Sequence, residues 1–206
     1  MKAKAEPRRR RSPKGESRRQ EILDAATKLF SHGGFHTASL ADIADAVGLT
    51  QAGLLHYFPS KAELLLAVLR QREERVLVDE TADAANKGIA YAEAFVETLR
   101  RNEKNPVMVQ LFAILSHEAI FTDHPAHPWF RERYAAVVAK AIDQLAATID
   151  ETKLPPGTTV ESIARLMIAA ADGLRLQWLL DPKALERPKV MNEFFALLAP
   201  YIKKPD

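Results

Sequence analysis

The chain has 206 residues, 47% of them hydrophobic, with no cysteine and a formal net charge of +2. This length accommodates one or two domains with a buried core. The lack of cysteine excludes a disulfide framework and a thiolate metal site. No apolar run follows the basic N-terminus, so a secretory signal is not expected. The most apolar stretch, residues 163–180, contains Arg165, Asp172 and Arg175, which argues against a membrane span. A cytoplasmic protein without a membrane partner is therefore expected.

The charge is unevenly distributed along the chain. Residues 1–19 contain nine Lys or Arg and two Asp or Glu, whereas the remaining residues contain 20 basic and 25 acidic side chains. Such asymmetry suggests a nucleic-acid or membrane partner for the basic end. Residues 1–16 have almost no apolar side chain and include Pro7, Pro13 and Gly15, which predicts a disordered basic arm. The arm either reaches phosphates or a minor groove, or is a solvated tail that only raises non-specific affinity.

The first helix is expected to begin at Ser17 and to end at Gly33-Gly34. One apolar stripe at helical spacing marks its buried face: Ile22, Ala25, Ala26, Leu29 and Phe30. This helix is scaffold for the elements that follow. Thr37 and Ser39 lie in the next loop, where hydroxyl groups and backbone amides suit phosphate contacts as well as capping.

Residues 39–61 are the stretch around which the chain is organised, and they read as two short helices about a glycine turn. Ser39 is placed to cap the first helix. Gly48 ends it, because glycine takes a left-handed conformation without steric cost. Thr50 caps a second helix at residues 51–57. The first helix has one apolar face, formed by Leu40, Ile43, Ala44 and Val47. This arrangement is typical of a helix-turn-helix.

The second of these helices has a first turn unlike that of a structural helix. Gln51, Ala52 and Gly53 are small or amide-bearing and present little apolar surface. Glutamine suits bidentate contact with adenine in the major groove, and small residues let a helix sit deep there. Lys61 opens a third helix, where backbone N–H groups favour a phosphate. The predicted DNA contacts are Thr37, Ser39, Thr50, Gln51, Ala52, Gly53, His56, Tyr57 and Lys61.

An ordered set of residues in this stretch resembles the TetR family of transcriptional regulators. The set comprises Phe35-His36-Thr37, Ile43-Ala44, Gly48-Leu49-Thr50, Gly53-Leu54, His56-Tyr57-Phe58-Pro59-Ser60-Lys61 and Leu64-Leu65. The resemblance covers roughly residues 17–65. Further on, residues 172–174 and 178–182 are similar to the subgroup typified by the choline-responsive repressor. At one position the chain departs from the family, since Leu55 stands where a phosphate-contacting tyrosine is usual. That contact is then left to His56 or Tyr57.

The rest of the chain is expected to be helical, with no strand pattern and no internal repeat. A helix from Ser60 to about residue 79 is apolar first and charged later, which suits a connector between domains. Proline and glycine breaks separate five more helices, expected at about 89–104, 106–120, 129–152, 159–180 and 188–202. Thr158 is the expected cap of the fourth of these, with Glu161 as its partner. That helix is apolar nearly all round, so it should be buried on most sides.

The C-terminal part is expected to combine a dimer interface with a ligand pocket between helices. The pocket follows from the resemblance, because aromatic and methionine side chains taken singly are more often core. The expected ligand-contacting residues are Phe95, Met108, Phe112, Glu118, Phe130, Tyr134, Met167, Asp172 and Trp178. The expected dimer interface comprises Ala169, Ala170, Gly173, Phe194, Leu198 and Tyr201.

Two of the expected ligand contacts, Glu118 and Asp172, are carboxylates in apolar surroundings. A buried carboxylate is costly unless it is paired. Arg175 lies three residues from Asp172 and would pair with it on the same helix face. If a carboxylate faces the pocket instead, the ligand should be mainly apolar with a cationic or hydrogen-bond-donating group.

Metal binding and catalysis are disfavoured by the sequence. His117, Glu118, His124 and His127 are metal-ligand types, but the first two point about 100° apart on a helix. The two other histidines lie in a proline-broken loop. No phosphate loop, GxSxG or HExxH motif stands out, so neither an enzyme nor a cofactor is expected.

The sequence thus predicts an all-α protein with a basic arm and two domains. The arm covers residues 1–16, a three-helix DNA-binding domain with a helix-turn-helix covers 17–65, and a six-helix ligand-binding and dimerisation domain covers 66–206. The implied function is a homodimeric repressor that binds a pseudo-palindromic double-stranded DNA operator and is released by a small-molecule effector. Two alternatives stay open: a constitutive DNA-binding protein without an effector, and a small-molecule sensor acting through protein partners.

Overall fold

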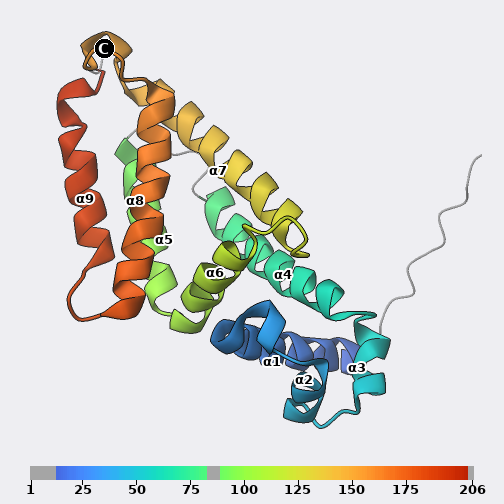
Figure 1. The fold of residues 1–206 in the computed structure, drawn as a ribbon. Helices are drawn as coiled ribbons and strands as arrows, with labels where there is room; N and C mark the ends of the chain where they lie inside the picture. The colour runs from blue at the N-terminus through green and yellow to red at the C-terminus, as the bar shows by residue number, and fades with distance from the viewer. Residues whose placement is uncertain (1–12, 83–88, 204–206) are drawn as a thin grey trace, which may run out of the picture.

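The computed structural model describes residues 13–82 and 89–203. Within these ranges the regular structure is α-helical, apart from two 3-10 turns and one isolated bridge. The predicted all-α class is therefore confirmed. Figure 1 shows an N-terminal group of helices at one end, a C-terminal group at the other, and a long helix between them. No helix in the described ranges is both long and apolar enough to cross a bilayer.

The N-terminal group consists of α1 (Pro13–Thr37), α2 (Leu40–Ala46) and α3 (Gln51–Tyr57). Helix α1 begins before the predicted Ser17, so residues 13–16, expected in the arm, are helical. The rest of the predicted arm, residues 1–12, lies outside the described residues. The run of α1 is broken at Gly34, which has φ 70° and ψ −171°. The expected end at Gly33-Gly34 is therefore confirmed.

Both predicted caps of the helix-turn-helix are present. The Asp42 N–H donates to Ser39 Oγ at 3.0 Å, and the Gly53 N–H donates to Thr50 Oγ1 at 3.1 Å. Gly48, with φ 63°, occupies the left-handed region that the turn requires. The side chain directly before each helix thus determines where α2 and α3 begin.

Helix α4 (Lys61–Ala82) runs from the N-terminal group into the C-terminal group (Figure 1). Its N-terminus is capped by Ser60, whose Oγ accepts the Glu63 N–H at 3.1 Å. The first half of α4 is apolar and buried at Leu64, Leu65, Val68 and Leu69. The predicted connector is therefore anchored in the core at its N-terminal end.

The C-terminal group contains α5 (Ile89–Glu103), α6 (Pro106–Glu118), α7 (His127–Thr148), α8 (Val160–Leu180) and α9 (Arg187–Leu197), with 3-10 turns at Glu151–Lys153 and Ala199–Tyr201. Helix α8 is capped by Thr159 with Ser162 as its capping-box partner. The prediction of Thr158 and Glu161 was wrong by one residue, because the hydroxyl groups of Thr159 and Ser162 satisfy each other's backbone N–H.

Helices α7 and α9 end earlier than the sequence predicted. The Asp150 N–H donates to the Tyr201 carbonyl, and the Lys203 N–H donates to the Thr148 carbonyl, both at 2.8 Å. These bonds flank an antiparallel bridge between Ile149 and Ile202. The bridge holds Ile149 in an extended conformation, which stops α7 at Thr148.

Two hydrophobic cores organise the molecule. The first joins α1–α4 to α6 and α7, with Leu111, Phe112, Leu115 and Phe130 packed among the buried residues of the N-terminal group. The second is formed by α5, α7, α8 and α9. Because the first core crosses from one group of helices to the other, the helix-turn-helix is held against α6 by apolar packing.

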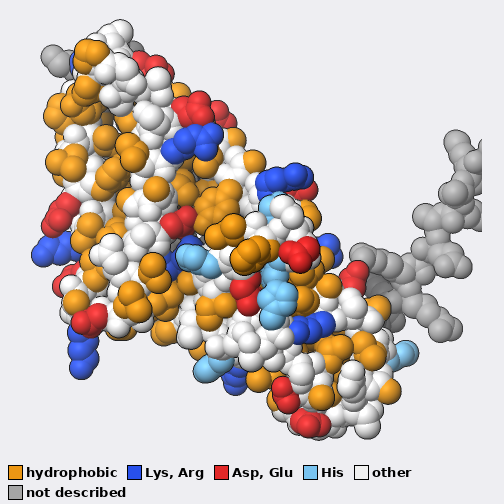
Figure 2. Space-filling model, in the orientation of Figure 1, with side chains coloured by type: hydrophobic (Ala, Val, Ile, Leu, Met, Phe, Trp, Pro, Cys, Tyr) orange, Lys and Arg blue, Asp and Glu red, His pale blue; other side chains and the backbone are white. Residues whose placement is uncertain are grey.

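One face of α8 is exposed in the single chain, so the predicted burial on most sides would require a partner over this face. Leu166 is 60% exposed and Leu180 is 78% exposed, and the neighbouring α9 leaves Leu197 73% exposed. Figure 2 shows hydrophobic side chains gathered over the edge where α8 and α9 lie. The exposed side chains recur at helical spacing on α8, so they form a continuous apolar strip.

Candidate DNA-binding surface and ligand cavity

Helix α3 buries one side and presents the other to solvent. Leu54 is fully buried and Phe58, just after the helix, is nearly so. The Arg19 guanidinium lies 4.9 Å from the Phe58 ring centre and adds a cation–π contact. Gln51, Ala52 and His56 are exposed, and the other predicted α3 contacts are partly exposed. The predicted base-reading turn therefore lies on the molecular surface.

Lys61 has partners within the protein. Its Nζ donates to the His36 carbonyl at 3.3 Å and lies 4.5 Å from the centre of the Phe35 ring. Burial lowers the pKa of Lys61, and the charge of Glu118 opposes that shift. Lys61 thus ties the start of α4 to the end of α1. Its predicted phosphate contact stays a prediction, as do those of Thr37, Ser39 and Thr50.

Glu118, the last residue of α6, contacts the N-terminal group of helices and does not line the cavity. Its Oε2 accepts the backbone N–H of Phe35 at 2.7 Å. A Cβ added to Gly34 would lie 2.1 Å from Glu118 Oε1, so only glycine leaves room for the carboxylate. The prediction of Glu118 as a ligand contact is corrected here. The carboxylate is instead a polar link between α6 and the end of α1.

His124, from the loop between α6 and α7, packs beside this link. Its ring is buried, with Nε2 3.6 Å from Glu118 Oε2, and its Nδ1 accepts the Ala126 N–H at 3.2 Å. Burial lowers the pKa of His124, with Glu118 opposing and His36 reinforcing the shift. Across the described residues, no three metal-ligand side chains are grouped as a metal site.

A cavity of about 400 Å³ lies among α4, α5, α6, α7, α8 and the start of α9. Four of the predicted ligand contacts line it: Phe95, Phe112, Tyr134 and Asp172. Volumes of this size are typical of small-molecule sites. The cavity therefore lies in the predicted C-terminal part, with α4 as one of its walls.

The other predicted ligand contacts do not line the cavity. Phe130 and Met108 belong to the core shared with the N-terminal group, and Met167 belongs to the core of α5 and α7–α9. Trp178 is buried, with the Arg187 guanidinium 5.5 Å from its ring centre. These four predictions are corrected, because helical spacing identifies an inward face without saying which inward residues meet a void.

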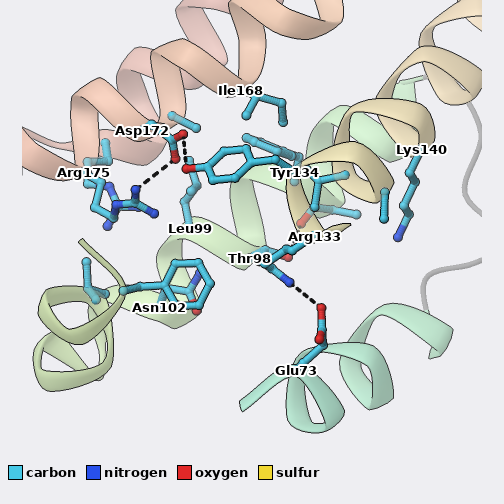
Figure 3. A pocket seen from close by; sticks show the side chains of 18 of the residues that line it. Glu73, Thr98, Leu99, Asn102, Arg133, Tyr134, Lys140, Ile168, Asp172 and Arg175 are labelled. Carbon is cyan, nitrogen blue, oxygen red and sulfur yellow. Dashed lines mark hydrogen bonds and ion pairs between the residues drawn. The ribbon is translucent and has the colours of Figure 1, made fainter. Parts of the chain in front are cut away.

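Asp172 both faces the cavity and has partners. The Tyr134 hydroxyl donates to its Oδ2 at 2.7 Å, and Arg175 Nη2 lies 3.2 Å from its Oδ1. Figure 3 shows Tyr134 and Arg175 converging on the carboxylate from two helices. Burial and the hydrogen bond to Asp172 raise the pKa of Tyr134. The predicted Asp172–Arg175 pair is confirmed, and this carboxylate is not a free counter-ion for a cationic ligand.

The arginines that line the cavity were not among the predicted ligand contacts. Arg72, Arg133, Arg175 and Arg187 all contribute to the wall. Three of their guanidiniums surround the Phe112 ring, with Arg72 at 3.8 Å, Arg133 at 5.1 Å and Arg175 at 5.8 Å from its centre. Arg175 was visible in the sequence as a charge within an apolar helix. Arg72 was not, because it lies in a charged stretch of α4.

Comparisons with known proteins point to a DNA-binding role for the N-terminal helices. Residues 22–68 match the family described as "Bacterial regulatory proteins, tetR family". The HTH-type transcriptional regulator TtgR from Pseudomonas putida is 28% identical over 185 residues, covering 86% of this chain and 88% of the relative.

Two solved structures have a similar fold over most of the chain. NalD, described as the secondary repressor of the MexAB-OprM multidrug efflux pump in Pseudomonas aeruginosa, aligns with a TM-score of 0.70 at 22% identity, covering 95% of this chain and 100% of that chain. A transcriptional regulator from Saccharomonospora viridis in complex with choline aligns with a TM-score of 0.73 at 18% identity, covering 92% and 100%. The relatives are transcriptional regulators and not enzymes, and residues 22–68 of this chain form a DNA-binding region of the TetR family type.

Proposed function

We propose that this chain is a homodimeric repressor, acting in the cytoplasm, that binds a pseudo-palindromic operator through α3 and releases it when a small molecule occupies the cavity. The observation that carries the proposal is the exposed first turn of α3, held on the buried Leu54 and Phe58. Repression, as opposed to activation, is supported by the description of NalD as a repressor. We take the DNA-binding domain as residues 17–65, preceded by the basic arm, and the ligand-binding and dimerisation domain as 66–206.

The operator contacts in this proposal are divided by what each group can read. Gln51 is the side chain of the first turn with both a donor and an acceptor, so it reads a base edge. Ala52 and Gly53 allow close approach to the groove. The remaining contacts are made with phosphates, which position the protein without reading sequence: Thr37, Ser39, Thr50, His56, Tyr57 and Lys61.

The proposed dimer uses the apolar strip of α8 and α9. Leu166, Ala169, Gly173 and Leu180 recur on one exposed side of α8, and small residues there allow close helix approach. A groove between α8 and α9 is lined by Ala169, Ala170, Gly173, Phe194 and Leu197, among others. Leu198 and Tyr201, which the sequence also suggested, are partly buried against the core of their own chain. Leu197 therefore replaces Leu198 as the proposed contact on α9.

The cavity is lined by two helices that also pack against the DNA-binding end. Arg72 and Glu73 on α4, and Phe112 on α6, line its wall. The same two helices hold the N-terminal group, through the shared core and through Glu118. A ligand that shifts α4 against α6 would change the spacing of the two α3 helices in a dimer. Release then requires that the ligand binds the non-DNA-competent dimer more tightly than the DNA-bound one.

The test is selection of binding sites from genomic fragments, followed by sedimentation of the chain with and without the selected DNA. We expect an inverted repeat bound by a dimer. Gly173→Arg combined with Leu197→Glu should give monomers with much weaker operator binding, whereas Ile120→Glu, at an exposed apolar residue elsewhere, should not. Failure to select any motif would favour a sensor acting through protein partners. A motif whose affinity no small molecule changes would favour a constitutive DNA-binding protein.

A further inference from the structure

Some arginines of the cavity have a carboxylate partner and others do not. Arg133 donates to Glu73 at 2.9 Å, and Arg175 pairs with Asp172. Figure 3 shows both pairs at the cavity wall. Arg72 lies beside Glu73 in the sequence, but the Glu73 carboxylate is engaged by Arg133. The cavity wall therefore contains a guanidinium whose charge is not neutralised by a direct partner in the described part of the chain.

Arg72 is also short of hydrogen-bond acceptors. Its Nη1 is buried without a partner in the described residues, and its Cζ lies 3.8 Å from the Phe112 ring centre. Stacking on a ring uses the face of a guanidinium and leaves its N–H edges free. Burial lowers the pKa of Arg72 to about 9, reinforced by the charges of Arg133 and Arg175 and opposed by Glu73. Arg72 thus stays charged at neutral pH while its buried Nη1 still requires an acceptor.

Arg187, at the start of α9, repeats this pattern at the same cavity. Its side chain is only 3% exposed, and both Nε and Nη1 are buried without a hydrogen-bond acceptor among the described residues. The nearest carboxylate is Glu103, at 3.9 Å, which is beyond hydrogen-bond distance. Burial lowers its pKa, with Glu103 opposing and Arg175 reinforcing the shift. Arg187, which is buried, and Arg72, which is partly buried, therefore each present an unused donor at one cavity.

The remainder of the wall is largely apolar. Phe95, Leu99, Val109 and Ile168 contribute to the lining, with Thr98, Asn102 and Gln144 as neutral polar groups and Lys140 as a further cation. Buried donors without acceptors are rare in folded proteins and costly. An arginine binds a carboxylate through two parallel hydrogen bonds of the strong, charge-assisted kind. The missing partner is therefore an acidic group attached to an apolar body.

We propose that the ligand of this cavity is an amphipathic organic anion whose acidic group binds the unpaired donor of Arg72, with Arg187 as a second cation on the wall, and whose apolar body lies against Phe95, Leu99 and Ile168. This inference rests on the proposed function, since it takes the cavity as the effector site. It reverses the sequence-based expectation of a cationic or donating ligand, because Asp172 is already neutralised by Arg175 and Tyr134.

The test compares three probes with one skeleton: octanoate, octanamide and octylamine. Their dissociation constants are measured by calorimetry on the full chain without DNA. Wild type should bind octanoate at least about tenfold more tightly than octanamide, and octylamine more weakly still. Arg72→Gln should lose that preference for the acid. Arg131→Gln, which removes an exposed charge from α7, should retain it.

A second measurement needs no ligand. Removing a partly buried cation with an unpaired donor should raise the melting temperature of Arg72→Gln above that of Arg131→Gln. Octylamine binding as tightly as octanoate, no octanoate binding at all, or an acid preference that survives in Arg72→Gln would each overturn the inference. Operator binding is measured on the same preparations. If wild type binds the operator but shows no preference for the acid, the anion site alone is refuted. If wild type binds octanoate but recognises no operator, the proposed function alone is refuted.

Discussion

Gly34 offers the sharpest test of how the DNA-binding end is joined to α6. With φ 70° and ψ −171° it occupies a region that is essentially restricted to glycine, and a non-glycine residue there costs about 1–3 kcal/mol. An added Cβ would also lie 2.1 Å from Glu118 Oε1 and displace the carboxylate. The Phe35 N–H would then lose its acceptor, which costs about another 1–3 kcal/mol. Gly34→Ala should therefore lower the free energy of unfolding by about 2–6 kcal/mol.

A matched control separates the two contributions. Gly157 also has a positive φ, 81°, but a Cβ there would meet nothing within 4 Å. Gly157→Ala should therefore cost only the backbone part, about 1–2 kcal/mol. Both variants and wild type are compared by urea unfolding followed by circular dichroism, with linear extrapolation to water.

The part that involves Glu118 is isolated by a double-mutant cycle. In a Glu118→Ala background the added methyl group meets no carboxylate, so Gly34→Ala should cost only its backbone part, about 1–3 kcal/mol. The coupling free energy between the two positions should then be about 1–3 kcal/mol. The reasoning is refuted if Gly34→Ala is no more destabilising than Gly157→Ala, or if the two substitutions in the cycle are simply additive.

Three further outcomes are expected. Gln51→Ala should weaken operator binding by about 1–3 kcal/mol and relax one base position per half-site, measured by DNA titration and repeated selection; an unchanged motif would remove Gln51 from base reading. Because burial lowers the pKa of His124, the unfolded state takes up the proton first, so stability should fall as the pH drops below about 6.5, by at most about 1.4 kcal/mol per pH unit. His124→Gln should flatten this slope in urea unfolding at pH 7.5 and 5.5, and an unaltered slope would contradict the assignment. Because burial and Asp172 raise the pKa of Tyr134, one of the four tyrosines should ionise late in an absorbance titration. Tyr134→Phe should abolish that late phase, and its persistence would assign the phase to another tyrosine.

The helix-turn-helix was predictable because its determinants are local. Ser39 and Thr50 cap helices through bonds that reach three residues along the chain, and Gly48 supplies the turn between them. The burial of Leu54 and the exposure of Gln51 follow from helical spacing once those boundaries are set. The bounds of α2 and α3, and the side of α3 that faces solvent, could therefore be derived from one short run of consecutive residues.

Other features depended on residues distant in the sequence. The sequence predicts Glu118 as a pocket residue, yet its carboxylate accepts the backbone N–H of Phe35, 83 positions away. Helix α7 stops at Thr148 because Lys203 donates to its carbonyl.

The cavity cations show the same limit. Arg72 lies in a charged stretch of α4, and only the packing of α5–α9 around it buries its Nη1 beside Arg133 and Arg175. Helical periodicity determines which side of a helix turns inward. Which inward side chains meet a core, a cavity or another charge depends on how the helices cross, and that is decided only when the whole chain has folded.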